Sequence, residues 1–230
     1  MSPRPATATR PALSRERVVQ AALDVADAEG VEAVTMRRLA ETLHVHPTSL
    51  YNHLPTKEAI LDGMADALIG EADIPSSFAG WEDWIRAMAT GLRKVARTHP
   101  GAFLVLAQRA ASGPFASAVS EAALDAFRRV GFRPAQAAEA LSAVSLSLLG
   151  VALNECPPMA PFTETDPREL SPEQYPRIAE VIAVAPDLGN SDGVWTIVVD
   201  SLIAGLSARV AALAPASRES ARRPARPARR

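Results

Sequence analysis

Six residues that suit contact with DNA follow one another closely inside the stretch TMRRLAETLHVHPTSLYNHLPTK, which runs from Thr35 to Lys57. They are Pro47, Thr48, Ser49, Tyr51, Asn52 and His53. Hydroxyl, amide and imidazole groups of this size can bond to base edges and phosphates from a helix that enters a major groove about 12 Å wide. The alternative is that Tyr51 and His53 pack against a small core and that the other polar residues form an ordinary solvated surface.

Two short helices must position these groups. Thr35 suits an N-cap, and the apolar spacing after it predicts a helix over Met36–Leu43. Pro47 is favoured at the first position of a helix because its missing N–H would be unpaired there. Only residues 44–46 remain between the two helices, which predicts a sharp reversal and a helix-turn-helix.

The surrounding order of residues resembles a known family. LSRERVVQAALDVADAEGVEAVTMRRLAETLHVHPTSLYNHLPTKEAILDGMADAL, residues 13–68, resembles the N-terminal domain of the tetracycline-repressor (TetR) family, with Gly30 ending the first helix, the pair Leu39 and Ala40, and the segment SLYNH. The resemblance implies contacts to an operator from Arg37, Pro47, Thr48, Ser49, Tyr51, Asn52, His53 and Lys57. We expect Tyr51, His53 and Lys57 to meet phosphates, and Arg37, Thr48, Ser49 and Asn52 to meet base edges.

The turn departs from the family pattern at two positions. The family usually has glycine where His44 stands, at a point that needs a left-handed backbone, and serine or a similar cap where His46 stands. We therefore expect the geometry of this turn to differ slightly from that of the family.

The overall charge is slightly acidic, but its distribution favours a nucleic-acid partner. The net charge is −2, whereas residues 35–57 hold Arg37, Arg38 and Lys57 against the single acid Glu41, together with three of the four histidines. Affinity for DNA should therefore depend on a fitted interface and fall steeply with salt.

Composition excludes several classes of protein. The content of 48% hydrophobic and 22% charged residues indicates a globular chain with a buried core. The single cysteine, Cys156, cannot form an intramolecular disulfide, and no metal-ligand spacing or cofactor motif is evident. The opening MSPRPATATRPA lacks the apolar core of a signal peptide, and the longest uncharged apolar run, residues 140–154, is shorter than a membrane span. We expect a cytoplasmic protein without a membrane partner.

Helical segments separated by breakers follow the first domain, so an all-α fold is predicted. The expected segments are Trp81–Thr98, Pro100–Ala111, Pro114–Val130, Pro134–Asn154, Pro172–Ala185 and Asp192–Leu213. The predicted organisation is a flexible arm at 1–12, a helix-turn-helix domain with its connecting helix at 13–72, a ligand-binding and dimerisation domain at 78–214, and a disordered arginine-rich tail at 215–230.

The later segments WEDWIRAMATGLRKVARTHPGAFLVLA and ALSAVSLSLLGVALNE resemble the regulatory domain of the tetracycline-repressor branch. This resemblance implies a cavity for a small-molecule effector among the middle helices and a homodimer made by the helices near 134–154 and 192–213. Both late helices carry more apolar surface than one core-facing stripe needs, which indicates dimerisation independently. A two-fold pair of reading helices predicts an inverted-repeat operator.

The resemblance also implies which residues meet the effector. Positions matching the family pocket are Met88, Leu92, Leu106, Arg109, Ser147 and Asn154, and Phe103 with Trp84, Phe115, Met159 and Phe162 could complete an apolar lining. Leu106 and Asn154 stand where tetracycline repressors hold a metal-binding histidine and a carboxylate, so a magnesium–tetracycline chelate is not expected. An uncharged apolar molecule, or one with an anionic group for Arg109, fits better.

Two other classes of function stay open on the sequence alone. An all-α chain with an apolar cavity could be an enzyme, although no nucleophile elbow, phosphate loop or paired-carboxylate pattern occurs. A helical protein could also bind a hydrophobic small molecule without binding DNA.

Overall fold

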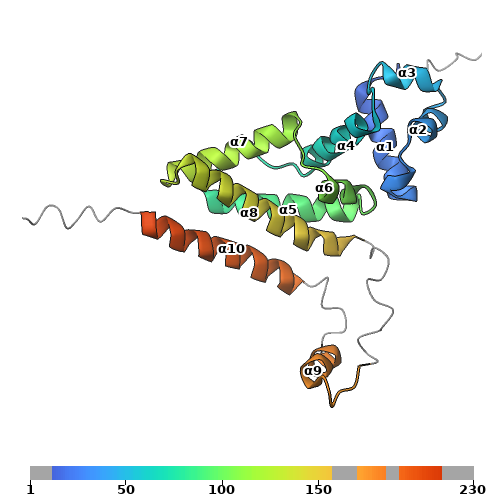
Figure 1. Ribbon diagram of the computed structural model, residues 1–230. Helices are drawn as coiled ribbons and strands as arrows, with labels where there is room; N and C mark the ends of the chain where they lie inside the picture. Colours follow the sequence, from blue (N-terminus) through green and yellow to red (C-terminus); the bar gives the residue numbers. More distant parts are fainter. Residues whose placement is uncertain (1–11, 157–169, 185–191, 214–230) are drawn as a thin grey trace, which may run out of the picture.

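Every regular element in the described part of the chain is a helix, as predicted. The computed structural model describes residues 12–156, 170–184 and 192–213. Figure 1 shows α1–α3 gathered at one end of the molecule and the remaining helices extending from it. Residues 1–11 of the expected arm and the whole of the expected tail at 215–230 lie outside the described residues.

Four helices form the N-terminal part: α1 (Arg15–Glu29), α2 (Met36–Leu43), α3 (Pro47–Tyr51) and α4 (Lys57–Glu71). Hydroxyl side chains fix three of the starts. Ser14 accepts from the N–H of Arg17 at 3.3 Å, Thr35 from that of Arg38 at 3.1 Å, and Thr56 from that of Ala59 at 3.0 Å. Each such cap stabilises its helix by about 1 kcal/mol.

The larger bundle consists of α5 (Trp81–Thr98), α6 (Val105–Gln108), α7 (Pro114–Arg129), α8 (Pro134–Ala152) and α10 (Asp192–Leu213). Its core contains the fully buried side chains of Trp84, Phe103 and Phe127. The Trp84 and Phe127 rings meet edge to face, with centroids 5.8 Å apart. Such aromatic pairs add about 1 kcal/mol to the effect of area burial.

Two of the expected segments form much shorter helices than the sequence predicted. The segment expected over Pro100–Ala111 is instead a 3₁₀ turn at Ala102–Leu104 followed by α6, because the N–H groups of Gly101 and Ala102 are bound by the Asp27 carboxylate of α1. The segment expected over Pro172–Ala185 is α9 (Pro176–Val184), which begins at the proline that suits the first helical position.

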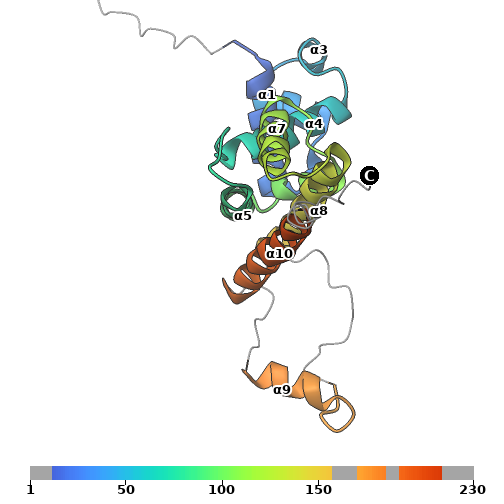
Figure 2. The same cartoon turned by 90° about the vertical axis from the view of Figure 1, so that its left-hand side faces the viewer.

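The late helices α8 and α10 pack side by side, and α10 also packs on α5 (Figures 1 and 2). Glu155 ties them together at one end, because its carboxylate accepts from Arg93 Nε at 2.6 Å, Arg97 Nε at 2.9 Å and Trp195 Nε1 at 2.9 Å. Burial opposes ionisation of Glu155, but these three hydrogen bonds outweigh it and lower the pKa of the carboxyl.

Most of the apolar residues along one side of α8, a helix that the sequence analysis expected in the dimer interface, are buried inside this chain. Ala137, Val144, Leu148 and Val151 are buried in the core. By length and composition alone, two segments could cross a membrane: Pro134–Glu155, a third of whose most apolar window is buried, and Asp192–Leu213, with 6% buried. The apolar surface of α10 is therefore left largely uncovered by the other described residues of the chain.

Candidate DNA-binding surface and effector cavity

The turn before α3 is built by the two histidines that depart from the family pattern. His44 takes the left-handed conformation, with φ 53° and ψ 48°, and its N–H bonds to the carbonyl oxygens of Ala40 and Glu41. His46 provides the N-cap of α3, since its Nδ1 accepts from the N–H of Thr48 at 3.4 Å and lies 2.8 Å from Thr48 Oγ1. An imidazole thus takes the place of the hydroxyl that usually caps this helix.

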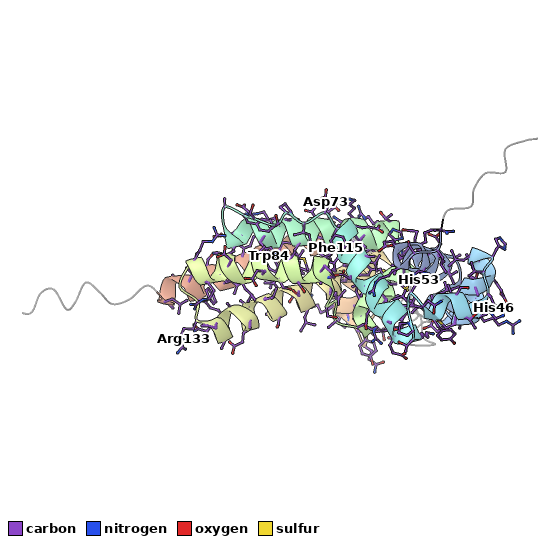
Figure 3. The ribbon with its side chains drawn as sticks, turned by 90° about the horizontal axis from the view of Figure 1, so that it is seen from above. His46, His53, Asp73, Trp84, Phe115 and Arg133 are labelled. Carbon is purple, nitrogen blue, oxygen red and sulfur yellow. The ribbon has the colours of Figure 1, made fainter. Side chains whose placement is uncertain are left out.

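The outward face of α3 carries the side chains that the sequence singled out. Pro47, Thr48, Tyr51 and Asn52 are exposed, and Ser49, His53 and Lys57 are half-buried. Leu50 and Leu54 are fully buried, so they hold this face outward by filling the core below it. Figure 3 shows His46 and His53 at the same end of the molecule. The structure brings seven of the eight expected DNA contacts together along α3 and the start of α4.

Arginine side chains flank this face with different constraints. The eighth expected contact, Arg37, is 88% exposed and pairs with Glu41, one turn further along α2, at 3.0 Å. Exposed pairs of this kind are weak, so Arg37 can exchange Glu41 for a phosphate or base at small cost. Arg38 instead reaches Glu29 of α1 at 2.6 Å and Thr42 at 3.0 Å, which fixes α2 on α1.

A cavity of about 480 Å³ lies among α4, α5, α6, α7 and α8. Of the residues expected to meet an effector, Met88, Leu92, Leu106 and Arg109 line it, together with Trp84. Phe103 is fully buried elsewhere in the core, and Ser147 and Asn154 are exposed and do not line it. Phe115 is 57% exposed, and Met159 and Phe162 lie outside the described residues.

Several lining residues were not predicted. Gln108, Ser120 and Leu149 belong to the wall, as do Leu141, Ser142 and Ser145 of α8. A helical periodicity shows which residues share a face but not what that face meets. A signal was present, however, because serines recurring at 142 and 145 on an otherwise apolar helix indicate a partly polar contact.

Three aspartates of the N-terminal part each receive hydrogen bonds from the helices that follow. Asp27 of α1 accepts from Gly101 N at 3.1 Å and Ala102 N at 2.8 Å, and Asp62 of α4 accepts from Arg109 Nε at 2.6 Å. Asp66 of α4 is 9% exposed and accepts from Ala116 N at 2.9 Å, at the start of α7. We call Asp27, Asp62 and Asp66 the joint.

His99 adds a titratable group to the joint. Its Nδ1 lies 2.6 Å from Asp27 Oδ2 and its Nε2 lies 2.7 Å from Glu71 Oε2, so one imidazole links α1 to the end of α4. Burial disfavours the charged ring, but the hydrogen bond to Asp27 and the charge of Glu71 outweigh that effect and raise the pKa of His99. Nothing near His99 in the sequence indicates its contact with Asp27, because the two residues stand 72 positions apart.

The cavity and the joint are continuous. Arg109 lines the cavity and donates a hydrogen bond to Asp62. Ala102, seven positions earlier in the chain, donates to Asp27. A molecule that displaced α6 would therefore disturb the hydrogen bonds that connect this region to α1 and to α4.

Comparison with protein families gives two matches that together span this arrangement. Residues 18–64 match the model described as bacterial regulatory proteins of the tetR family, and residues 74–210 match the tetracycline-repressor-like C-terminal domain. The chain belongs to the tetR family.

Individual relatives of this tetR-family protein agree with that assignment. An HTH-type transcriptional regulator of Saccharopolyspora erythraea is 39% identical over 143 residues, a match that spans 62% of this chain and 61% of the relative. A possible TetR family transcriptional regulator from Streptomyces coelicolor has a TM-score of 0.71 at 28% identity, covering 85% of this chain and 99% of that one. ActR of the same organism, solved in complex with actinorhodin, has a TM-score of 0.70 at 26% identity, covering 87% and 99%.

Proposed function

We propose that this protein is a transcriptional repressor of the cytoplasm that binds an inverted-repeat operator as a homodimer and is released by a small molecule. The observation that carries the proposal is the exposed polar face of α3, which lies beside the exposed Arg37. The joint connects the domain that holds this face to the helices around the cavity. The names of the compared relatives, which are regulators, support this function over catalysis.

We assign the residues of the α3 face to two kinds of DNA contact according to their side-chain chemistry. Arg37, Thr48, Ser49 and Asn52 meet base edges, and Tyr51, His53 and Lys57 meet phosphates, with Pro47 packed against the backbone. The Thr48 hydroxyl already lies near His46 Nδ1, so it can accept from a base amine while keeping that contact.

A second copy of the chain would double this reading surface. We propose that α8 and α10 form the homodimer, because Ile197 of α10 is 69% exposed and only Trp195 and Leu206 of that helix are buried. A side-chain Cβ at Gly150 or Gly205 would meet no atom within 4 Å, which leaves room for close approach of partner helices. The two α3 helices would then read half-sites about 34–36 Å apart.

The effector is proposed to act through Arg109. An occupant that moves α6 shifts Arg109 and with it Asp62 on α4, which changes the spacing of the two DNA-binding domains. A coupling of about 1–3 kcal/mol, or roughly 5- to 150-fold in operator affinity, is typical of such linkage.

A gel shift with the DNA that flanks the protein's own gene tests DNA binding. We expect Asn52→Ala to weaken the shift by roughly 5- to 150-fold, the effect of losing one base contact. Gln20→Ala removes an exposed carboxamide from α1 of the same domain and should leave the shift unchanged. If no inverted repeat is bound specifically at low or moderate salt, the protein is not a regulator of this kind.

Dimerisation is tested separately by light scattering after size-exclusion chromatography. Ile197→Glu places a charge on the exposed surface of α10 and should yield a monomer, whereas Ile178→Glu alters an exposed isoleucine of α9 and should not. A dimer that survives Ile197→Glu would contradict the proposed interface.

A further inference from the structure

Trp84 carries a buried hydrogen-bond donor that has no partner among the described residues. The side chain is fully buried, and its indole Nε1 bonds to no protein acceptor there. Trp195 offers a contrast, because its Nε1 donates to Glu155 at 2.9 Å. Leaving a buried donor unpaired is costly, and native structures keep few such groups without a reason.

The position of Trp84 supplies a reason. The residue lies on α5 and forms part of the cavity wall, with Met88 and Leu92 further along the same helix. Its ring is held by the edge-to-face contact with Phe127 and lies inside the bundle (Figure 3). The indole ring is therefore fixed in the wall of the cavity, and its N–H has no acceptor among the described residues.

The rest of the wall limits the charge of that occupant. Arg109 is the charged residue among those lining the cavity, and its Nε already bonds to Asp62 at 2.6 Å. The Asp62 carboxylate already offsets the charge of Arg109, so an anionic ligand would lose its hydration in exchange for a partly neutralised partner. The remaining polar wall is neutral: Gln108 and the hydroxyls of Ser120, Ser142 and Ser145.

We propose that the effector is a largely apolar, uncharged molecule that presents a carbonyl-type oxygen to the indole N–H of Trp84. This inference rests on the proposed role of the cavity as the effector site and adds the chemical class of the ligand. The carbonyl accepts from Nε1, and apolar groups of the ligand fill the space beside Met88, Leu92 and Leu106. Pairing a carbonyl with an otherwise unpaired buried donor should strengthen binding by about tenfold.

Three probes with one ring skeleton isolate this contact: 9-fluorenone, fluorene, which lacks the carbonyl, and fluorene-9-carboxylate, which is charged at pH 7. Calorimetric titration of the full-length protein should give an affinity about tenfold higher for fluorenone than for fluorene, and lower for the carboxylate than for fluorenone. Equal binding of fluorenone and fluorene, or binding of neither, overturns the proposal. Tightest binding by the carboxylate overturns its charge assignment.

Substitution and NMR then locate the acceptor. Trp84→Phe keeps an aromatic ring and removes the N–H, so it should abolish the preference for fluorenone over fluorene. Trp81→Phe is the matched control, because the Trp81 ring also stacks on Phe127, with centroids 6.0 Å apart, but does not line the cavity. In the wild-type protein, the indole ¹⁵N–H signal of Trp84 should shift with fluorenone and stay near its place with fluorene.

The NMR measurement keeps the test decisive if Trp84→Phe fails to fold. The Trp84 signal is then assigned by elimination from Trp81→Phe and Trp195→Phe. An unmoved Trp84 signal at saturating fluorenone overturns the proposal, whatever the gel shift shows. Absence of a specific gel shift would instead refute the regulator function and leave the fluorenone preference standing.

Discussion

Replacing Asp27 by asparagine should weaken the joint in a way that depends on pH. The amide oxygen can still accept from Gly101 N and Ala102 N, but the charge that faces His99 is lost. A hydrogen bond between ionised groups contributes about 1.5–3 kcal/mol and a neutral one about 0.5–1.5 kcal/mol. The charge-dependent part of the change is therefore about 1 kcal/mol.

The sign follows from the direction of the His99 shift. Its pKa is raised in the folded protein above the ordinary value of about 6.5, so the stabilisation is fully present below that pH and is lost as pH rises through the folded-state value. Asp27→Asn should thus destabilise the protein more at pH 5.5 than at pH 9. The difference should be about 1 kcal/mol, or roughly 2–4 °C in melting temperature for a chain of this size.

Thermal unfolding followed by circular dichroism at the two pH values measures this difference. Asp24→Asn makes the same change of charge on the same helix, where Asp24 is exposed and bonds to Gln20 at 3.1 Å, and it should show no such pH dependence. An equal penalty for Asp27→Asn at both pH values, or a larger one at pH 9, would refute the reasoning about His99.

Three further predictions concern other parts of the chain. Gly101→Ala should lower the free energy of unfolding by about 1–3 kcal/mol in urea titrations, because the added Cβ would lie 2.4 Å from Ala26 O and 2.8 Å from Asp27 Cα; wild-type stability would mean that α1 and this loop can separate freely. His44→Gly should raise it by roughly 0.5 kcal/mol, since φ is 53° there, and an unchanged or lower value would show that the turn is not strained. Burial raises the pKa of the Cys156 thiol to about 11, so iodoacetamide at pH 8 should react slowly with the native protein and rapidly in urea, and equal rates would contradict its burial.

Local signals made the helix-turn-helix predictable from the sequence. The caps at Ser14, Thr35 and Thr56 bond to an N–H three positions away, and the proline at the start of α3 acts through its own missing N–H, so each signal is local in the sequence. The bounds of α2 agree with the prediction for the same reason. The left-handed turn at His44 was also expected, because the family that the sequence resembles usually has glycine at this position.

The joint and the unexpected part of the cavity could not be predicted in the same way. Asp27 and His99 meet only because α1 packs against the loop before α6, and the sequence offers no nearby pattern that records this approach. The two carboxylates Asp62 and Asp66 came closest to a signal, since they stand four residues apart on an otherwise apolar helix. Which side of α8 faces the cavity is set by the packing positions of α6 and α7, which the sequence of α8 alone does not indicate.

The joint has a consequence for the construction of hybrid regulators. A chimera that takes its DNA-binding domain from one relative and its regulatory domain from another is naturally spliced between residues 64 and 74, where the two family matches meet. That splice separates Asp27 from His99, Gly101 and Ala102, and Asp62 from Arg109. Under the proposed mechanism, such a hybrid would respond to an effector only if the aspartates of the joint and the groups that donate to them came from the same relative.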